Sequence, residues 1–147
     1  MFTVTEAVSI ARPCDEVFAF LADGRNRPQW DTTVISEELT SPEPVGVGST
    51  IHSRMRAMGR EVDFDWRVTQ FDRPARMDIV STSGAMPTSL TIEFTEAAAG
   101  CDVRATIEGS PEGMMRLVEP LIAETVRSTL ATGLARAKDL LESRPTE

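Results

Sequence analysis

The sequence predicts an α+β fold in which a curved antiparallel sheet folds around one long C-terminal helix. From Ser49 to Gly109 polar and apolar residues alternate between turn sequences, which is typical of a β-meander with one face in water. After Pro111 the apolar residues recur every three or four positions, as on one face of a helix. An apolar helix face and an apolar sheet face cover each other, so both segments are expected to share one core.

Length, composition and charge are those of an ordinary soluble protein. The 147 residues suit a single domain over 1–147, large enough to fold without a metal or a disulfide. A net charge of −8 disfavours nucleic acid and anionic membranes as partners. The sequence holds no run of 18 apolar residues and no segment typical of a secretory signal. We therefore expect a cytoplasmic protein without membrane insertion, and both monomer and homodimer stay open.

Few residues could bind a metal or form a disulfide. Cys14 and Cys101 are too few for a disulfide framework and lack the spacing of metal ligands. We interpret them as two reduced, partly buried thiols. With His52 as the single histidine, a transition-metal site is not expected, and no cofactor is expected.

The first fifty residues predict two strands separated by two short helices. Thr3 to Ile10 alternates and indicates a strand. Pro13 suits the start of a short helix, and a second helical turn is expected over Asn26 to Trp30. Val34 to Leu39 indicates the next strand. The segment Ser41 to Gly48 holds two prolines and two glycines and is expected to be a loop.

Charge and burial together predict the register of the first hairpin, which turns at Met58–Gly59. One face then pairs Arg56 with Glu61, Arg54 with Asp63 and His52 with Asp65. The other face pairs Met55 with Val62, Ser53 with Phe64 and Ile51 with Trp66. A slip by one residue would move the charges into the core. The acidic row and His52 are therefore interpreted as a solvated face.

Three further hairpins extend this pair into a five-stranded meander. The second turns at 71–74 and is expected to pair Arg67 with Asp78, Trp66 with Ile79 and Val68 with Met77. The third turns at 83–87 and pairs Ile79 with Leu90 and Met77 with Ile92. The fourth turns at 98–100 and pairs Glu93 with Arg104, Phe94 with Val103 and Leu90 with Ile107.

The C-terminal segment predicts a helix of about 20–25 residues, long enough to lie across the sheet. Pro120 cannot donate to the carbonyl of Arg116, so we expect a kink there or a helix that begins afresh at Pro120. Gly133 would leave room on the inner side for a ligand or for close contact with the sheet. The residues expected to face the sheet are Met114, Val118, Leu121, Ile122, Thr125, Thr129 and Leu140.

The expected inner face combines apolar side chains with hydroxyls at Ser53, Ser81, Thr88, Thr125 and Thr129. A hydroxyl that faces a dry core without a partner costs about 1–3 kcal/mol, which favours water or a ligand with polar groups. Hydrogen bonding to nearby backbone is the alternative. The candidate ligand-binding residues are Trp30, Ser53, Met55, Phe64, Trp66, Ile79, Ser81, Leu90, Ile92, Thr125 and Thr129.

Four methionines gather at one end of the predicted sheet, namely Met58, Met86, Met114 and Met115. Flexible thioether side chains suit a portal for varied apolar molecules, and they equally suit ordinary gap filling.

No strong catalytic motif is present. Residues 45–48 lack the third glycine and the following helix of a phosphate loop, and no nucleophile elbow occurs. Acid–base catalysis needs a titratable group inside the pocket, and the predicted inner face offers none. We therefore name no catalytic residue, which argues against an enzyme.

Three segments resemble the SRPBCC (START-like) superfamily, and most closely its bacterial polyketide cyclase/dehydrase-like group. They are RPCDEVFAFLADGRNRPQWD, a loop that ends in VGVGS, and LVEPLIAETVRSTLATGLARAKDLLES. The resemblance implies a seven-stranded helix-grip fold, with the first two strands completing the sheet and a cavity between sheet and helix. The superfamily includes lipid and hormone carriers, aromatic polyketide cyclases, quinone-binding proteins and a chaperone activator. No catalytic residue can be carried over by motif.

Three functions follow as hypotheses. The first is a carrier or sensor that binds a small hydrophobic molecule of lipid, polyketide or aromatic type. The second is an enzyme of the polyketide cyclase or dehydratase kind. The third is a protein-interaction module that uses the loop over 41–48 or an edge strand.

Overall fold

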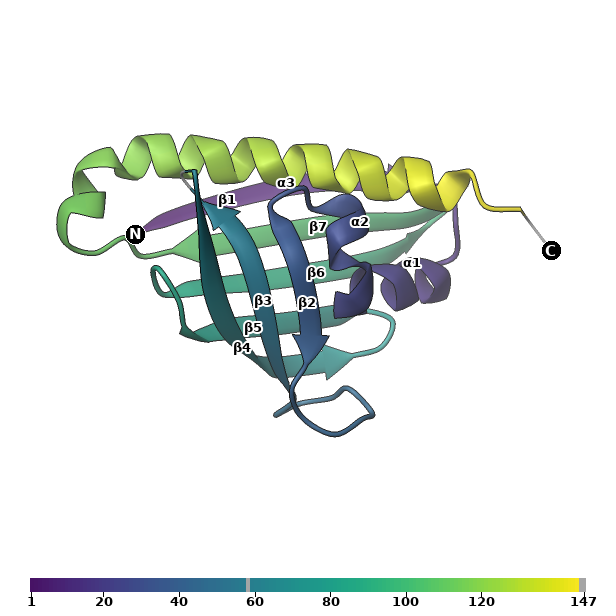
Figure 1. Ribbon diagram of the computed structural model, residues 1–147. Coiled ribbons are helices and arrows are strands. Elements are labelled where there is room, and N and C mark those ends of the chain that lie inside the picture. The colour runs from purple at the N-terminus through teal and green to yellow at the C-terminus, as the bar shows by residue number, and fades with distance from the viewer. Residues whose placement is uncertain (58, 146–147) are drawn as a thin grey trace.

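A computed structural model describes residues 1–57 and 59–145. Seven antiparallel strands form one sheet in the order β1-β7-β6-β5-β4-β3-β2, so the first two strands lie at its two edges. The sheet curls around α3, and the predicted helix-grip fold is confirmed (Figure 1). The strands are β1 (Phe2–Ile10), β2 (Val34–Leu39), β3 (Thr50–Ala57), β4 (Arg60–Asp72), β5 (Arg76–Ser83), β6 (Thr88–Ala97) and β7 (Gly100–Gly109).

The helices occupy the two places that the sequence predicts. Between β1 and β2 lie α1 (Cys14–Leu21), the short 3₁₀ helix η1 (Gly24–Asn26) and α2 (Arg27–Trp30). After β7 come the 3₁₀ helix η2 (Gly113–Val118) and the long helix α3 (Glu119–Glu142). Pro120 lies in the first turn of α3, where its missing N–H is not needed. The helix therefore begins afresh at this proline, as one of the two alternatives predicted.

Three of the four hairpin registers are confirmed residue by residue. The turn residue Met58 itself lies outside the described residues. The predicted register of the second hairpin is wrong by two positions, since Trp66 pairs with Ser81 and Val68 pairs with Ile79. Strand β4 runs on to Asp72 through an irregularity after Val68, which moves the turn towards residues 73–75.

Packing explains this longer strand. The ring of Phe71 lies edge-on to the ring of Phe18 in α1, with 5.3 Å between centroids. Treating Phe71 as a turn residue would expose it, whereas extending β4 packs it against α1. A shift of two residues keeps each side chain on its face of the sheet. The same residues therefore face inward as predicted, but those on β4 and β5 have different cross-strand partners.

The inward face of α3 differs from the expected one. The residues that it buries are Ile122, Leu130, Gly133, Leu134, Ala137 and Leu141. Met114 and Leu121 are 83% and 63% exposed, and Thr125 is exposed with its hydroxyl donating to the Leu121 carbonyl at 2.9 Å. The expectation that these three face the sheet is wrong. One 3.6-residue stripe cannot continue from the 3₁₀ turns of η2 into α3, because the residues per turn change at the join.

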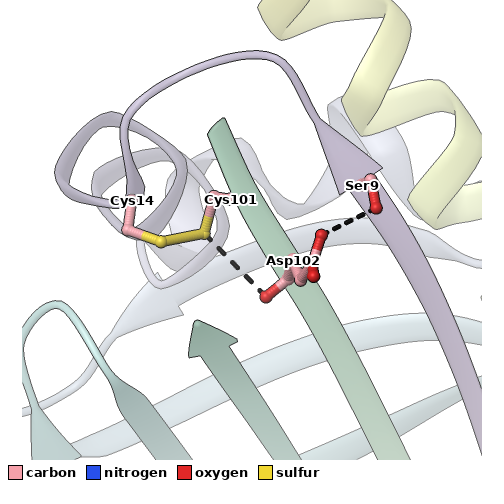
Figure 2. Close-up of a disulfide and its surroundings, with 4 residues drawn as sticks. All are labelled: Ser9, Cys14, Cys101 and Asp102. Carbon is pink, nitrogen blue, oxygen red and sulfur yellow. Dashed lines mark hydrogen bonds between the residues drawn. A yellow bond between two sulfur atoms is a disulfide. The ribbon is translucent and has the colours of Figure 1, made fainter. Parts of the chain in front are cut away.

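The two cysteines form a disulfide between α1 and the start of β7 (Figure 2). The expectation of two reduced thiols is therefore wrong. Cys101 lies opposite Ile10 in the β1–β7 register, and Cys14 follows Ile10 after one tight turn. This places the two Cα atoms 5.0 Å apart, within the range that a disulfide spans. Sequence separation alone, 87 positions, hides this proximity.

Candidate functional site

A cavity of about 150 Å³ lies between the sheet and the first half of α3. Its walls come from α2 and the segment after it, from the four strands β3, β4, β6 and β7, from the β5–β6 connection and from α3. Most of the wall is aliphatic or aromatic, and polar atoms enter mainly from α2 and from threonines. The lining residues are Arg27, Trp30, Asp31, Thr33, Met55, Ala57, Phe64, Trp66, Met86, Thr88, Leu90, Ile92, Ala105, Ile107, Val126, Thr129 and Leu130.

Two stacked aromatic rings form part of this wall. Phe64 and Trp66 point inward from β4 because residues two apart share a face of a strand. Their ring centroids are 5.2 Å apart and their planes differ by 15°. The indole Nε1 of Trp66 has a hydrogen-bond partner within the protein, since it donates to the hydroxyl of Ser53 at 3.2 Å. A flat apolar surface therefore faces the cavity.

A buried polar cluster of Arg27, Asp31, Glu37 and Ser53 lies beside the cavity. Arg27 and Asp31 are one helical turn apart, and the Arg27 guanidinium donates to Asp31 Oδ2 at 3.3 Å. Arg27 Nη1 lies 3.6 Å from Glu37 Oε1. The Ser53 hydroxyl donates to the same carboxylate oxygen at 2.5 Å. Because Arg27 and Asp31 also line the cavity, the expectation that the inner face offers no titratable group is wrong.

Burial dominates the electrostatics of Glu37, whose side chain is only 4% exposed. Removal from water raises the pKa of Glu37, although Arg27 and the Ser53 hydroxyl act in the opposite direction. Asp31 is held differently, because its Oδ1 accepts from the backbone N–H and the hydroxyl of Thr33 at 2.9 and 2.6 Å. The cluster thus places a cation and two carboxyl groups against an apolar chamber.

A β-bulge explains why Glu37 points inward. Val34 pairs with Met55, but Ser36 pairs with Arg54, so Ile35 is the extra residue on β2. Without the bulge, Val34 and Glu37 would lie on opposite faces. With it, both face the interior, and Ile35 is left partly exposed. Alternation alone could not indicate this change of face.

Trp30 closes the cavity between α2 and α3. The side chain is 2% exposed, and its Nε1 has no hydrogen-bond partner among the described residues. The opposite edge of the indole packs on Gly133, where a Cβ atom would lie 3.1 Å from Trp30 Cε3. Gly133 therefore makes room for α2, and not for the ligand or the sheet contact expected.

The structure gathers seven of the predicted lining residues around the cavity, and four lie elsewhere. Those at the cavity are Trp30, Met55, Phe64, Trp66, Leu90, Ile92 and Thr129. Ser53 belongs to the polar cluster, Ile79 is buried in the core, and Thr125 is exposed. The Ser81 hydroxyl accepts from the backbone N–H of Thr88 at 2.9 Å, which is the backbone alternative foreseen for such hydroxyls.

Of the expected methionine portal, Met86 lines the cavity and Met115 packs partly buried against the core. Met114 is exposed, and Met58 lies outside the described residues. His52 lies on the outer face, as predicted, with Nδ1 2.8 Å from Asp65. This hydrogen bond to Asp65 raises the pKa of His52.

A second, larger hollow of about 740 Å³ lies between α1, β2 and the β4–β5 turn. It is more polar than the cavity and carries three acidic side chains beside Glu37: Asp23, Glu38 and Glu43. The Arg27–Glu37 ion pair lies between the two spaces, because Arg27 lines the first and Glu37 the second. Within the described residues no group of three or more His, Cys, Asp or Glu side chains could hold a metal ion.

The family model described as polyketide cyclase/dehydrase and lipid transport matches residues 1–142. The chain belongs to this family. No match was found among curated proteins. The match to the family model confirms the predicted membership of the SRPBCC-like superfamily.

Several solved structures share the fold of this family member at low sequence identity. A protein from Thermus thermophilus is 19% identical, with a TM-score of 0.84, 97% of this chain covered and 100% of the other. A START superfamily protein from Mycobacterium smegmatis is 15% identical, with a TM-score of 0.76 and coverages of 95% and 98%. DynU16, from the dynemicin biosynthetic locus, is 17% identical with a TM-score of 0.69, over 96% of this chain and 47% of DynU16.

Proposed function

We propose that this family member binds a small hydrophobic ligand in the cavity between the sheet and α3, as a carrier or sensor. The observation that carries the proposal is the apolar chamber itself, walled by the stacked Phe64 and Trp66 on one side and by α3 on the other. Family membership supports a ligand-binding role in general.

The size of the chamber restricts the ligand. Sites for drug-sized molecules measure roughly 300–1,000 Å³, and this cavity measures about 150 Å³. An apolar cavity of about that volume holds one benzene ring. A ligand with several fused rings would need the second hollow as well, and the Arg27–Glu37 pair separates the two. We therefore propose a ligand of about one ring in size.

Titration with toluene, followed by tryptophan fluorescence and by native mass spectrometry, tests this proposal. Ala105 lies fully buried in the cavity wall, so Ala105→Leu should fill the space and weaken binding at least tenfold. Ala131→Leu makes the same change on the exposed side of α3 and serves as the control. Equal binding by both variants, or none by the unaltered protein, would refute the proposal.

A cyclase or dehydratase activity is the second candidate, and the polar cluster favours it. Arg27 and Asp31 reach the cavity wall, where they could orient a carbonyl group and accept a proton. The probe is 2,4,6-heptanetrione, a short polyketone that closes to one ring with loss of water. Ring closure faster with the protein than in buffer, and slowed by Asp31→Asn without loss of binding, would support an enzyme. An unchanged rate would exclude this reaction.

Localisation and partners stay proposals. Among the described residues no helix is long and apolar enough to cross a membrane. We retain the cytoplasm as the proposed compartment, although the Cys14–Cys101 disulfide is more typical of an oxidising one. Alkylation of free thiols in intact cells, before lysis, would distinguish the two. Interaction through the loop over 41–48 also stays a proposal, and a cross-linking survey would test it.

A further inference from the structure

The join between η2 and α3 carries exposed apolar side chains on its outer side. Leu117 is 82% exposed and Val118 is 36% exposed, and they lie between the exposed Met114 and Leu121. Met114, Leu117 and Leu121 follow each other at three and four positions, which is the spacing of one helix face. We call these four residues the apolar stripe. Helix α3 runs along the upper edge of Figure 1, with the sheet on its other side.

The apolar stripe is large for a surface that stays in water. The exposed fractions of its four residues leave roughly 500 Å² accessible, and the largest apolar patch on a typical monomer measures about 300–600 Å² and is often functional. Two such surfaces in contact would bury about 1,000 Å², the lower limit expected of a specific protein interface. A pair of stripes is therefore large enough for a weak complex.

The charges beside the stripe are complementary to a second copy of themselves. Arg116 lies about one turn before Pro120 and Glu124 about one turn after it, and both are exposed. In an antiparallel pair with a twofold axis level with Pro120, residues whose numbers add up to about 240 lie opposite each other. Arg116 then faces the partner's Glu124, and symmetry repeats this contact. A parallel pair would set like charges against each other.

The same axis allows the leucines of two copies to interdigitate. Their order along the contact is Leu117, the partner's Leu121, Leu121 and the partner's Leu117. Neighbours in this series are two positions apart, or about 3 Å along the helix axis, so each leucine lies between two leucines of the other copy, as ridges pack into grooves. The apolar and the charged residues thus agree on one arrangement.

A membrane surface is a poorer match for the stripe. Helices that lie on membranes carry mainly Lys and Arg on their polar side. Here the charged residues around the stripe are acidic as well as basic, namely Glu112, Arg116, Glu119, Glu124 and Arg127, and the net charge of the chain is −8. The balance of charges favours a partner that carries both signs.

We propose that the apolar stripe is the interface of a homodimer, in which a second copy of this chain packs antiparallel about a twofold axis at Pro120. The two stripes form the apolar centre of the contact, and two Arg116–Glu124 ion pairs flank it. This inference is independent of the ligand and of the cavity.

Sedimentation velocity over a range of concentrations tests the dimer. The unaltered protein should pass from monomer to dimer between about 1 μM and 500 μM, as expected of a small interface. Leu121→Glu places a carboxylate at the centre of the contact and should weaken the dimer at least tenfold. Ala135→Glu adds the same charge at an exposed position of α3 away from the stripe and should leave the dimer unchanged. Circular dichroism checks that both variants are folded.

Charge reversal tests the antiparallel arrangement. Arg116→Glu and Glu124→Arg should each weaken self-association, because like charges would meet twice in either homodimer. An equimolar mixture of the two variants should form a heterodimer, since both ion pairs are restored with their signs exchanged. Native mass spectrometry distinguishes this heterodimer from both homodimers by mass. The mixture is needed because Glu124 also lies 3.9 Å from Arg127 of its own chain.

Three results would overturn the inference. The first is a monomer at every concentration up to about 500 μM. The second is a dimer that Leu121→Glu leaves as tight as Ala135→Glu does. The third is a mixture of the charge variants in which the heterodimer is no more abundant than the homodimers. A monomer that floats with phosphatidylcholine vesicles, and loses this binding in Leu121→Glu, would assign the stripe to a membrane instead.

Discussion

Replacing Arg27 with methionine tests the buried polar cluster beside the cavity. Methionine keeps most of the length of the side chain, so contact with the Trp30 ring is largely preserved while the charge is lost. Asp31 and Glu37 then lose their shared cation inside the protein. Removing one partner of a buried ion pair costs about 3–5 kcal/mol.

The retained hydrogen bonds place the expected loss near the lower end of this range. Asp31 still accepts from Thr33, and Glu37 still accepts from Ser53. We therefore expect Arg27→Met to lower the free energy of unfolding by about 3 kcal/mol and Tm by roughly 10 °C for a chain of this size. Urea titration followed by circular dichroism at pH 7 measures the first, provided that the m-value is unchanged.

A control and a double variant make the test specific. Arg25→Met breaks an exposed ion pair with Asp23 and should cost no more than about 1 kcal/mol. In Arg27→Met/Glu37→Gln one buried charge is removed together with its partner, so the loss should be smaller than the sum of the single losses. A loss below about 1 kcal/mol for Arg27→Met, or additivity of the two changes within about 0.5 kcal/mol, would refute the reasoning.

Three further predictions concern other parts of the fold. Burial raises the pKa of Glu37, so the stabilisation that this residue provides is present in acid and is lost as pH rises from about 4.5 through the raised pKa. In urea titrations, the free energy of unfolding of the unaltered protein relative to that of Glu37→Gln should therefore fall over that pH range. A difference that does not change with pH would contradict this. Cys14→Ala/Cys101→Ala opens a loop of 87 positions and should lower stability by about 4–5 kcal/mol in the chain-entropy model; a thiol assay of the denatured, unreduced protein that finds two free thiols would exclude the bond. Gly133→Val forces a side chain against Trp30 and should destabilise by about 1–3 kcal/mol and shift the tryptophan emission, with an unchanged spectrum as the contrary result.

The sheet could be predicted because two independent patterns agree on its register. In the first hairpin, opposite charges pair on one face at the same register that buries Ile51 and Trp66 on the other. The second hairpin lacks such agreement at its turn, since Phe71 can be assigned to a turn or to a strand on local grounds. Only its contact with Phe18, from a helix fifty residues earlier, decides the matter.

The candidate site was harder to predict than the sheet because its polar residues depend on irregular backbone. Glu37 faces inward only because a bulge on β2 inserts Ile35. Thr125 faces outward because η2 and α3 do not share one helical period across Pro120. Arg27 and Asp31 could have been noticed as a pair four residues apart, but nothing in α2 itself shows which side meets the sheet.

The disulfide restricts the routes by which a ligand could enter the cavity. Cys101 lies at the far end of β7 from Ile107, and α3 passes that end with its last turns, whereas the guest chamber lies beside Val126 and Leu130. Helix α1 is thus covalently linked to the sheet and cannot move away from it to open the cavity. Segments without such a covalent link, such as the β5–β6 connection with Met86 and the first turns of α3, are where a ligand would have to enter.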